Sequence, residues 1–334
     1  MAFRTSPSDE DGPPERVHVR AVAEASRDAY LAAVTDIPVQ VPVDALPLAQ
    51  AGVCEQHVEF TVPSFVDGTS ALTVTGTLTA SAALPATQRG VHMSRIVTSI
   101  ASMSGHRHAS FNAFLERAAR DVAAAQGLTI ADVSFSGATT AERVTVVTGR
   151  ASPDRFGVFG SAHLDDGTVS MRVGLRAAVM TACPCTQAYT WHSTVLALAD
   201  RFGTDIADAV GEYFVGYTHS QRGNLEADVE SDDSAALSWL YAAMESGAQL
   251  TYELLKRPDE HELVQRAHGR PQFTEDVARA VAAALLRSAP LDPLGDLVVT
   301  CRNVESIHAH DVYAVVRGKV GVLAAALRST VPPA

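Results

Sequence analysis

The sequence predicts an α+β fold in which antiparallel strand pairs are combined with helices. In segments such as 71–80 and 169–175, apolar and polar residues alternate strictly, which is typical of strands with one buried face. Strand pairs, helices and strand pairs then follow one another twice along the chain. This order favours antiparallel sheets with the helices on one face over a parallel, doubly wound sheet.

In the first half of the chain, particular residues mark where the elements begin and end. Three prolines within 36–48 exclude a regular helix or a central strand there. Ser110 is a suitable N-cap, and Gly127 a suitable stop, for a helix with an apolar stripe between them. Strand-like residues resume near Thr129.

The second half of the chain repeats this order of elements. Apolar residues at helical spacing predict a long helix over 234–257, which ends just before Pro258. A further helix is expected to begin near Thr274. Alternation predicts strands at 169–175, 224–230, 297–301 and 312–316.

The chain has 334 residues, which is enough for two units of domain size. Its first residues are polar and proline-rich, which predicts a disordered or extended leader. We expect a leader at 1–35, a first unit at 36–160, a second unit at 161–320 with a helical insertion at about 188–217, and a C-terminal tail at 321–334.

Composition limits the partners and the compartment. The 38 acidic side chains outnumber the 26 basic ones and give a formal net charge of −12, which argues against binding to a nucleic-acid polymer. A single nucleotide needs only a few local cations and is compatible with this charge. No stretch has the pattern of an export signal or a membrane span, so we expect a cytoplasmic protein without a membrane partner.

Two cysteines one residue apart form the sharpest local feature of the sequence. Cys183 and Cys185 follow an alternating segment directly, and thiolates at a strand end can bind zinc or other borderline metals. Their spacing differs from the C-x₂-C of a structural zinc site, and the other cysteines, Cys54 and Cys301, lie far away in sequence. The spacing alone leaves a metal site, a thiol nucleophile and two buried apolar side chains open.

Four further clusters combine cations, histidines, hydroxyls and carboxylates, at 89–95, 218–222, 256–260 and 305–310. The first suits an anionic ligand. The cations of the third would also suit the C-terminus of the helix predicted before them. Kinase, dehydrogenase, zincin and hydrolase functions lose their usual support, because the phosphate-loop, dinucleotide, HExxH and GxSxG motifs are all missing from the sequence.

Taken together, six motifs resemble the family of GTP cyclohydrolases IB and IV. They are RGVHMSR, ACPC, HSQR, LLKRPDE, FTED and ESIHAH, and they follow the family's order over residues 89–310. The resemblance implies a tunnelling fold of tandem ββααββ units that assemble into a toroidal homo-oligomer, dimeric or tetrameric, with active sites between subunits. It also implies GTP as the substrate.

The resemblance assigns a divalent metal to three residues. Cys183 and His219 look like two of its ligands and Glu260 like the third, which leaves a position for water, as a catalytic site requires. Iron(II), manganese(II) and zinc all suit this donor set. Glu275 resembles the carboxylate with which such enzymes accept two N–H bonds from guanine, and adenine would leave it unpaired.

The remaining motif residues resemble a catalytic group and a binding group. Glu305 and His308, with the neighbouring His310, look like the residues that position water and move protons. The residues expected to hold the rest of GTP, chiefly its triphosphate, are Arg89, His92, Ser94, Arg95, Gln221, Arg222, Lys256 and Arg257. The implied reaction is metal-assisted hydrolysis at C8, which opens the imidazole ring and releases formate. Type IB enzymes give 7,8-dihydroneopterin triphosphate, and type IV enzymes give 7,8-dihydroneopterin 2′,3′-cyclic phosphate.

One departure from the type IB pattern leaves the product open. Residues 184–218 separate Cys183 from His219, which are close in sequence in type IB members, and they are expected to add one or two helices. This insertion looks more like type IV. Two other functions stay open, namely a tunnelling-fold nitrile reductase with a cysteine nucleophile and a nicotinamide cofactor, and a purine- or pterin-binding protein without turnover.

Overall fold

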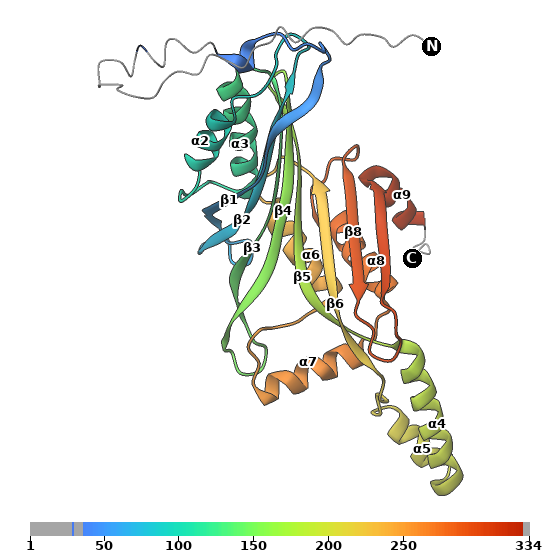
Figure 1. Ribbon diagram of the computed structural model, residues 1–334. Helices are drawn as coiled ribbons and strands as arrows, with labels where there is room; N and C mark the ends of the chain where they lie inside the picture. Colours follow the sequence, from blue (N-terminus) through green and yellow to red (C-terminus); the bar gives the residue numbers. More distant parts are fainter. Residues whose placement is uncertain (1–28, 30–35, 330–334) are drawn as a thin grey trace, which may run out of the picture.

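The computed structural model describes Ala29 and residues 36–329 (Figure 1). Most of the leader expected at 1–35 therefore lies outside the described residues, as does the end of the tail, 330–334. Among the described residues, no helix is both long enough and apolar enough to span a membrane.

A single antiparallel sheet runs through the described part of the chain (Figure 1). Its strands are ordered β1-β2-β3-β4-β5-β6-β8-β9, and the short strand β7 pairs with β5. The strands are β1 (Leu48–Pro63), β2 (Ala71–Leu84), β3 (Ile130–Val144), β4 (Ala151–Asp165), β5 (Thr168–Ala182), β6 (Ser220–Glu230), β7 (Gln249–Leu250), β8 (Asp296–Asn303) and β9 (Val312–Lys319).

Most helices lie in the connections between strands, whereas the first precedes β1 and the last follows β9, so the α+β prediction is confirmed. They are η1 (Ile37–Val39), α2 (Met93–Ala101), α3 (Phe111–Gln126), α4 (Pro184–Phe202), α5 (Thr204–Gly211), α6 (Ala236–Gly247), α7 (Arg257–Gly269), α8 (Thr274–Ser288) and α9 (Val320–Ser329). Helices α4 and α5 overlap the segment where a helical insertion is expected, and α9 overlaps the expected tail. The division into two units stays a prediction.

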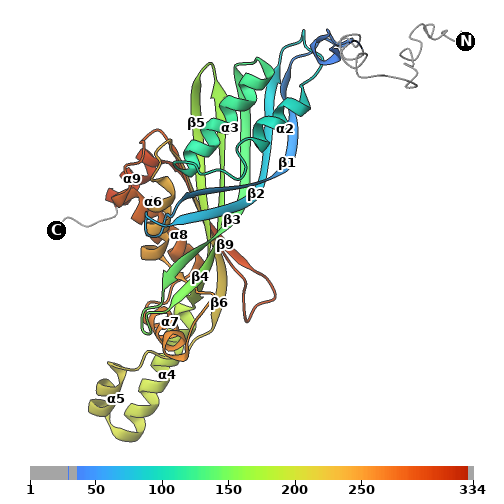
Figure 2. The same ribbon diagram turned by 90° about the vertical axis from the view of Figure 1, so that its left-hand side faces the viewer.

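Helices α3 and α6 cover the same face of the sheet (Figure 2). Phe156 and Gly160 lie four residues apart in β4 and therefore point to one face. A Cβ on Gly160 would lie 2.9 Å from side-chain atoms of Phe111 and Leu115 in α3. Phe156 packs edge to face on Tyr241 of α6, with 5.8 Å between the ring centroids. The hydrophobic core lies between this face and the helices, as the alternating sequence predicts.

The ends of α3 confirm the two signals in its sequence. The Ser110 hydroxyl accepts a hydrogen bond from the backbone N–H of Ala113 at 3.0 Å, and Gly127 has a φ of 66°. The first contact satisfies an N–H that the helix itself leaves unpaired, and the second is a left-handed conformation that glycine adopts without strain. Local residues therefore determine both ends of this helix.

The prediction of one long helix over 234–257 is wrong beyond Gly247, where α6 ends. A Cβ on Gly247 would lie 2.7 Å from the Val281 side chain, so glycine permits the close approach of α6 to α8. The chain then leaves the helix and pairs with β5 as β7, where Leu250 lies opposite Val179. Tyr252, which continues the helical spacing in sequence, instead stacks on a guanidinium of β3 at 4.1 Å.

The sheet has two distinct ends along its strands. Strand β5 begins at Thr168, beside the end of β4, and finishes at Ala182, which pairs with Ser220 at the start of β6. We call the end at Thr168 the upper end and the end at Ala182 the lower end, as they stand in Figure 1. The 15 residues of β5 separate the two ends by about 46 Å at roughly 3.3 Å per residue step.

Candidate active site

The ACPC and HSQR motifs meet at the lower end of β5 and β6. Cys183 directly follows β5 and precedes α4, and its backbone N–H donates to the carbonyl of His219 at 3.2 Å. The Thr218 hydroxyl donates to the carbonyl of Cys183 at 2.8 Å. Both the Cys183 and the His219 side chains are partly exposed. Antiparallel pairing thus brings these two residues together, although α4 and α5 separate them in sequence.

Beside them lies a pair of polar side chains from β6 and the β8–β9 loop. Gln221 Nε2 donates to Glu305 Oε1 at 3.2 Å, and His219 Nδ1 lies 3.2 Å from the hydroxyl of Ser306. The second oxygens, Gln221 Oε1 and Glu305 Oε2, are buried without a hydrogen-bond partner among the described residues. Such a carboxylate oxygen is costly to bury and is available to accept a proton or an N–H group.

The start of helix α8, which carries Glu275, contacts the end of β8, which leads to Glu305. The hydroxyl of Thr274, the residue before Glu275, accepts a hydrogen bond from Asn303 Nδ2 at 2.8 Å, and Asn303 is two residues before Glu305. Burial, and then the charge of nearby Glu275, raise the pKa of the Cys301 thiol to about 12, so this thiol stays protonated at neutral pH. Glu275 itself is exposed and can reach a ligand.

Helix α7 lies across the lower end, and its first turn is fixed to the β3–β4 turn (Figure 1). Buried Asp259 accepts hydrogen bonds from the backbone N–H groups of Val147 and Thr148 at 3.0 and 2.9 Å, and from the Thr148 hydroxyl at 2.6 Å. Burial alone would raise the pKa of this carboxyl, but the hydrogen bonds outweigh it and lower the pKa to about 2. The start of α7 is therefore anchored by a residue that the sequence reasoning did not single out.

Lys256 and Arg257 begin α7, so the expectation that they end a helix is wrong. Both are exposed, and neither side chain has a hydrogen-bond or ion-pair partner in the part of the chain that the structure describes. Cations are unfavourable at a helix N-terminus, where the helix dipole is positive. The stability of the helix does not explain their position, and both side chains are free to meet an anion.

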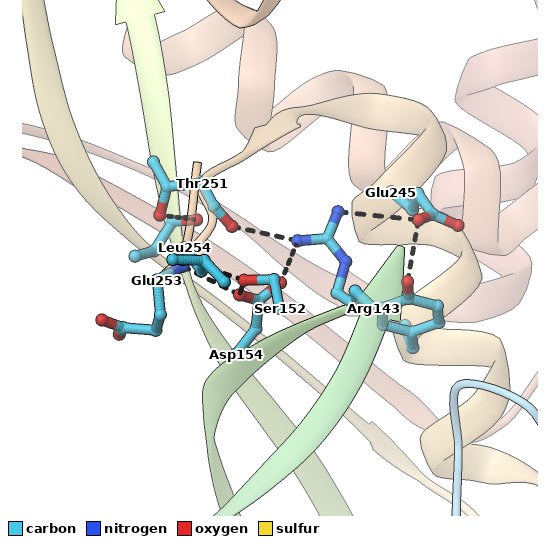
Figure 3. Close-up of polar contacts among 9 residues, drawn as sticks. Arg143, Ser152, Asp154, Glu245, Thr251, Glu253 and Leu254 are labelled. Carbon is cyan, nitrogen blue, oxygen red and sulfur yellow. Dashed lines mark hydrogen bonds and ion pairs between the residues drawn. The ribbon is translucent and has the colours of Figure 1, made fainter. Parts of the chain in front are cut away.

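A buried ion pair holds the segment that leads into α7. Figure 3 shows the Arg143 guanidinium of β3 donating from Nη1 to Asp154 Oδ2 at 3.0 Å and to the carbonyl of Thr251 at 2.9 Å. Asp154 also accepts a hydrogen bond from the backbone N–H of Glu253 at 2.8 Å. Residues 251–254 are thereby joined to the β3–β4 hairpin, close to the KRPDE motif.

The donor set at the lower end fits a metal in part. Thiolate and imidazole suit zinc and iron, and Cys183 and His219 supply them together. Glu260 lies in the first turn of α7, whereas His268, near its end, is the residue that contacts β6, at 2.9 Å from the Ser220 hydroxyl. Eight residues of helix correspond to about 12 Å. Accordingly, no group of three or more His, Cys, Asp and Glu side chains converges on a metal position within residues 36–329.

The RGVHMSR residues lie at the upper end, far from the other motifs. They follow β2, whose last residues pair with the start of β3. His92 and Arg95 lie 3.6 and 3.9 Å from Asp36, and the backbone N–H of His92 donates to Gln126 at the end of α3. Arg89, Ser94 and Arg95 are exposed. One chain therefore does not bring these residues to Cys183.

The last predicted residues occupy the rim of the lower end. His308 and His310 are exposed in the β8–β9 loop, with their rings stacked at 5.4 Å. Arg222 is exposed on β6, and its carbonyl accepts the backbone N–H of Val304. No hydrogen bond or ion pair joins Glu305 to His308 in the described part of the chain, so their joint role stays a prediction.

Comparison with known proteins decides the family. The model of the family described as type I GTP cyclohydrolase FolE2 matches residues 34–314. The chain belongs to the FolE2 family of GTP cyclohydrolases. It is therefore an enzyme of the GTP cyclohydrolase family, as the six motifs predicted.

This chain is similar in sequence to GTP cyclohydrolases of two names, FolE2 and MptA. The GTP cyclohydrolase FolE2 of Staphylococcus carnosus is 30% identical over 247 residues, which cover 72% of this chain and 75% of the relative. The GTP cyclohydrolase MptA of Thermoplasma volcanium is 31% identical over 243 residues, which cover 69% of this chain and 78% of the relative. Among solved structures, a hyper-thermostable uricase mutant aligns with 80% of this chain and 90% of its own, with a TM-score of 0.41 and 10% identity.

Proposed function

We propose that this FolE2-family chain hydrolyses GTP at C8 of the guanine, opens the imidazole ring and releases formate. The observation that carries the proposal is the gathering of Cys183, His219, Gln221, Glu305 and Glu275 at the lower end of the sheet. These residues come from four elements and four sequence motifs. The gathering supplies metal ligands, a carboxylate for proton transfer and a carboxylate for the purine.

Glu275 is proposed to hold the guanine. Its carboxylate can accept the N1–H and the 2-amino group together, which neither adenine nor hypoxanthine can satisfy. Its place at the start of α8 gives it a defined position relative to Cys183 and Glu305. The purine edge would thus be held while C8 points toward the strand ends.

Cys183 and His219 are proposed to hold a divalent metal, iron(II), manganese(II) or zinc. Glu260 stays the proposed third ligand, although the described residues of one chain do not bring it together with the other two. When bound, the metal would activate water for attack at neutral pH. Glu305 would accept or return a proton through its unpartnered buried Oε2. His308 and His310 stand on the loop above it and would exchange that proton with solvent.

We propose that a second subunit completes the site, because the upper-end residues cannot reach the lower end of their own chain. Strand β9 is one edge of the sheet and presents exposed Tyr313 and Val315, as an edge that pairs with another chain would. Arg89, His92, Ser94 and Arg95 of one subunit would then join Arg222, Lys256 and Arg257 of another around the triphosphate. Dimers and tetramers both satisfy this requirement.

The test is an anaerobic incubation of the purified protein with GTP and iron(II) or manganese(II). Formate and the pterin product are followed by mass spectrometry. A triphosphate product would place the enzyme with type IB, and a cyclic phosphate with type IV. The second outcome is favoured by α4 and α5, which extend the chain directly after Cys183. Absence of formate with every metal would overturn the proposal and leave purine or pterin binding without turnover.

A further inference from the structure

A single buried amide lies behind the candidate active site. Asn303, the last residue of β8, is 0% exposed. Its Nδ2 donates at 2.8 Å to the hydroxyl of Thr181 in β5 and at 2.8 Å to the hydroxyl of Thr274 in α8. The two threonines are 2% and 3% exposed, so both contacts are shielded from water.

The sequence around this residue leaves room for an amide. Leu297, Val299 and Cys301 precede Asn303 on the same face of β8 and are all 0% exposed, so an apolar side chain would be expected at this position. Opposite it on β6 is Gly223, where a Cβ would lie 2.3 Å from Asn303 Oδ1. A glycine on the neighbouring strand thus makes space for a polar group in the core, where such a group is costly unless it is hydrogen-bonded.

Each element that the amide joins leads directly to a residue of the candidate site. Thr181 is two residues before Cys183, Thr274 immediately precedes Glu275, and Asn303 is two residues before Glu305. One side chain therefore connects the strand that carries a metal ligand, the helix that carries the guanine carboxylate and the strand that carries the proton-transfer carboxylate.

We infer that Asn303 is a positioning residue that sets the distance between Glu275 and the Cys183 strand, and thereby fixes C8 of the bound guanine relative to Cys183. The inference rests on the proposed function, because the distance between Glu275 and Cys183 matters only if the two residues act on the same bound nucleotide. Asn303 touches no substrate. It acts through Thr274 on the start of α8 and through Thr181 on the end of β5.

Two isosteric variants break the contacts one at a time. Thr274→Val removes the acceptor on α8, and Thr181→Val removes the acceptor on β5. Thr139→Val is the matched control, since the buried Thr139 hydroxyl donates to the carbonyl of Thr73 at 2.7 Å on strands away from the site. All three variants lose one buried hydrogen bond, so all three should lose similar stability.

The distinguishing readout is the preference for GTP over inosine triphosphate, which lacks the 2-amino group that Glu275 would bind. Thr274→Val should raise the KM for GTP and reduce this preference by about 3- to 10-fold, the equivalent of one hydrogen bond, with unchanged metal content. Thr181→Val should lower metal content or kcat and keep the preference. Thr139→Val should change neither the nucleotide preference nor the metal content nor the kinetic constants.

A Thr274→Val variant with the KM and nucleotide preference of the Thr139→Val control would overturn the inference and make Asn303 a purely structural core residue. Failure of the proposed function is seen separately, as a wild type that releases no formate. In that case the affinities for GTP and inosine triphosphate replace the kinetic constants, and the same loss of preference in Thr274→Val supports the inference. A wild type that binds the two nucleotides equally would overturn it.

Discussion

The buried ion pair between Arg143 and Asp154 should contribute strongly to stability. Both side chains are 5% exposed, and the Nη1–Oδ2 distance is 3.0 Å. Asp154→Asn keeps the shape of the side chain and the oxygen that accepts the N–H of Glu253. The other oxygen, which accepts from Arg143, becomes an NH₂ group that faces the guanidinium as a second donor. Arg143 then retains the carbonyl of Thr251 and, at 3.7 Å, the half-exposed carboxylate of Glu245.

The expected cost follows from this geometry. Removal of one partner from a buried ion pair costs about 3–5 kcal/mol, and the remaining contact with Glu245 places Asp154→Asn near 3 kcal/mol, the lower end of that range. In an Arg143→Met background no buried cation is left, so the same change should cost less than about 1 kcal/mol. The coupling between the two positions should therefore be at least about 2 kcal/mol, within the range for residues in contact.

Urea unfolding at a fixed protein concentration, followed by the fluorescence of Trp191 and Trp239, measures these free energies. Asp121→Asn is the matched control, because Asp121 forms an exposed pair with Arg117 at 3.2 Å and should cost less than about 0.5 kcal/mol. An equal loss of unfolding free energy on Asp154→Asn with and without Arg143 would refute the reasoning, because the loss would then not depend on the guanidinium.

Four other substitutions test the site and its anchor. Glu275→Gln should weaken GTP binding in calorimetry while metal content is kept, because an amide has one acceptor where a carboxylate has two; unchanged affinity would contradict the assignment. Cys183→Ala should lose both metal and turnover, whereas Cys185→Ala should retain its metal by elemental analysis, and equal loss in both would show that the ligand is misassigned. The pKa of Asp259 is lowered from 3.8 to about 2 on folding, so its stabilisation is complete above pH 4 and is lost as the pH falls toward 2. The difference in thermal midpoint between wild type and Asp259→Asn should therefore narrow over that range, and a constant difference would argue against the anchor.

The parts of the fold that could be predicted are those set by neighbouring residues. The cap at Ser110 and the glycine at Gly127 act within one turn of helix, and the strands follow from alternation with a period of two. The end of α6 could not be predicted, because Gly247 is followed by pairing with β5, a contact between segments about 70 residues apart in sequence. Helical spacing continued past that point without a helix.

The same distinction applies to the candidate site. The motif residues were found by resemblance, and strand pairing explains why several of them meet. Asn303 carried a signal of its own, as a polar residue that continues the buried face of β8. Arg143 and Asp259 carried none, because a charged residue that is buried by a distant partner looks in sequence like any exposed one. Their partners come from elements that only the folded chain brings together.

The separation of the motifs along the strands has a genetic consequence. If each site is built from the lower end of one subunit and the upper end of another, a defect at one end of a chain damages only the site to which that end contributes. Chains inactivated at Cys183 and chains inactivated at Arg95 would then complement each other when they are assembled together. The two lesions behave as if they lay in separate genes, although both belong to one polypeptide.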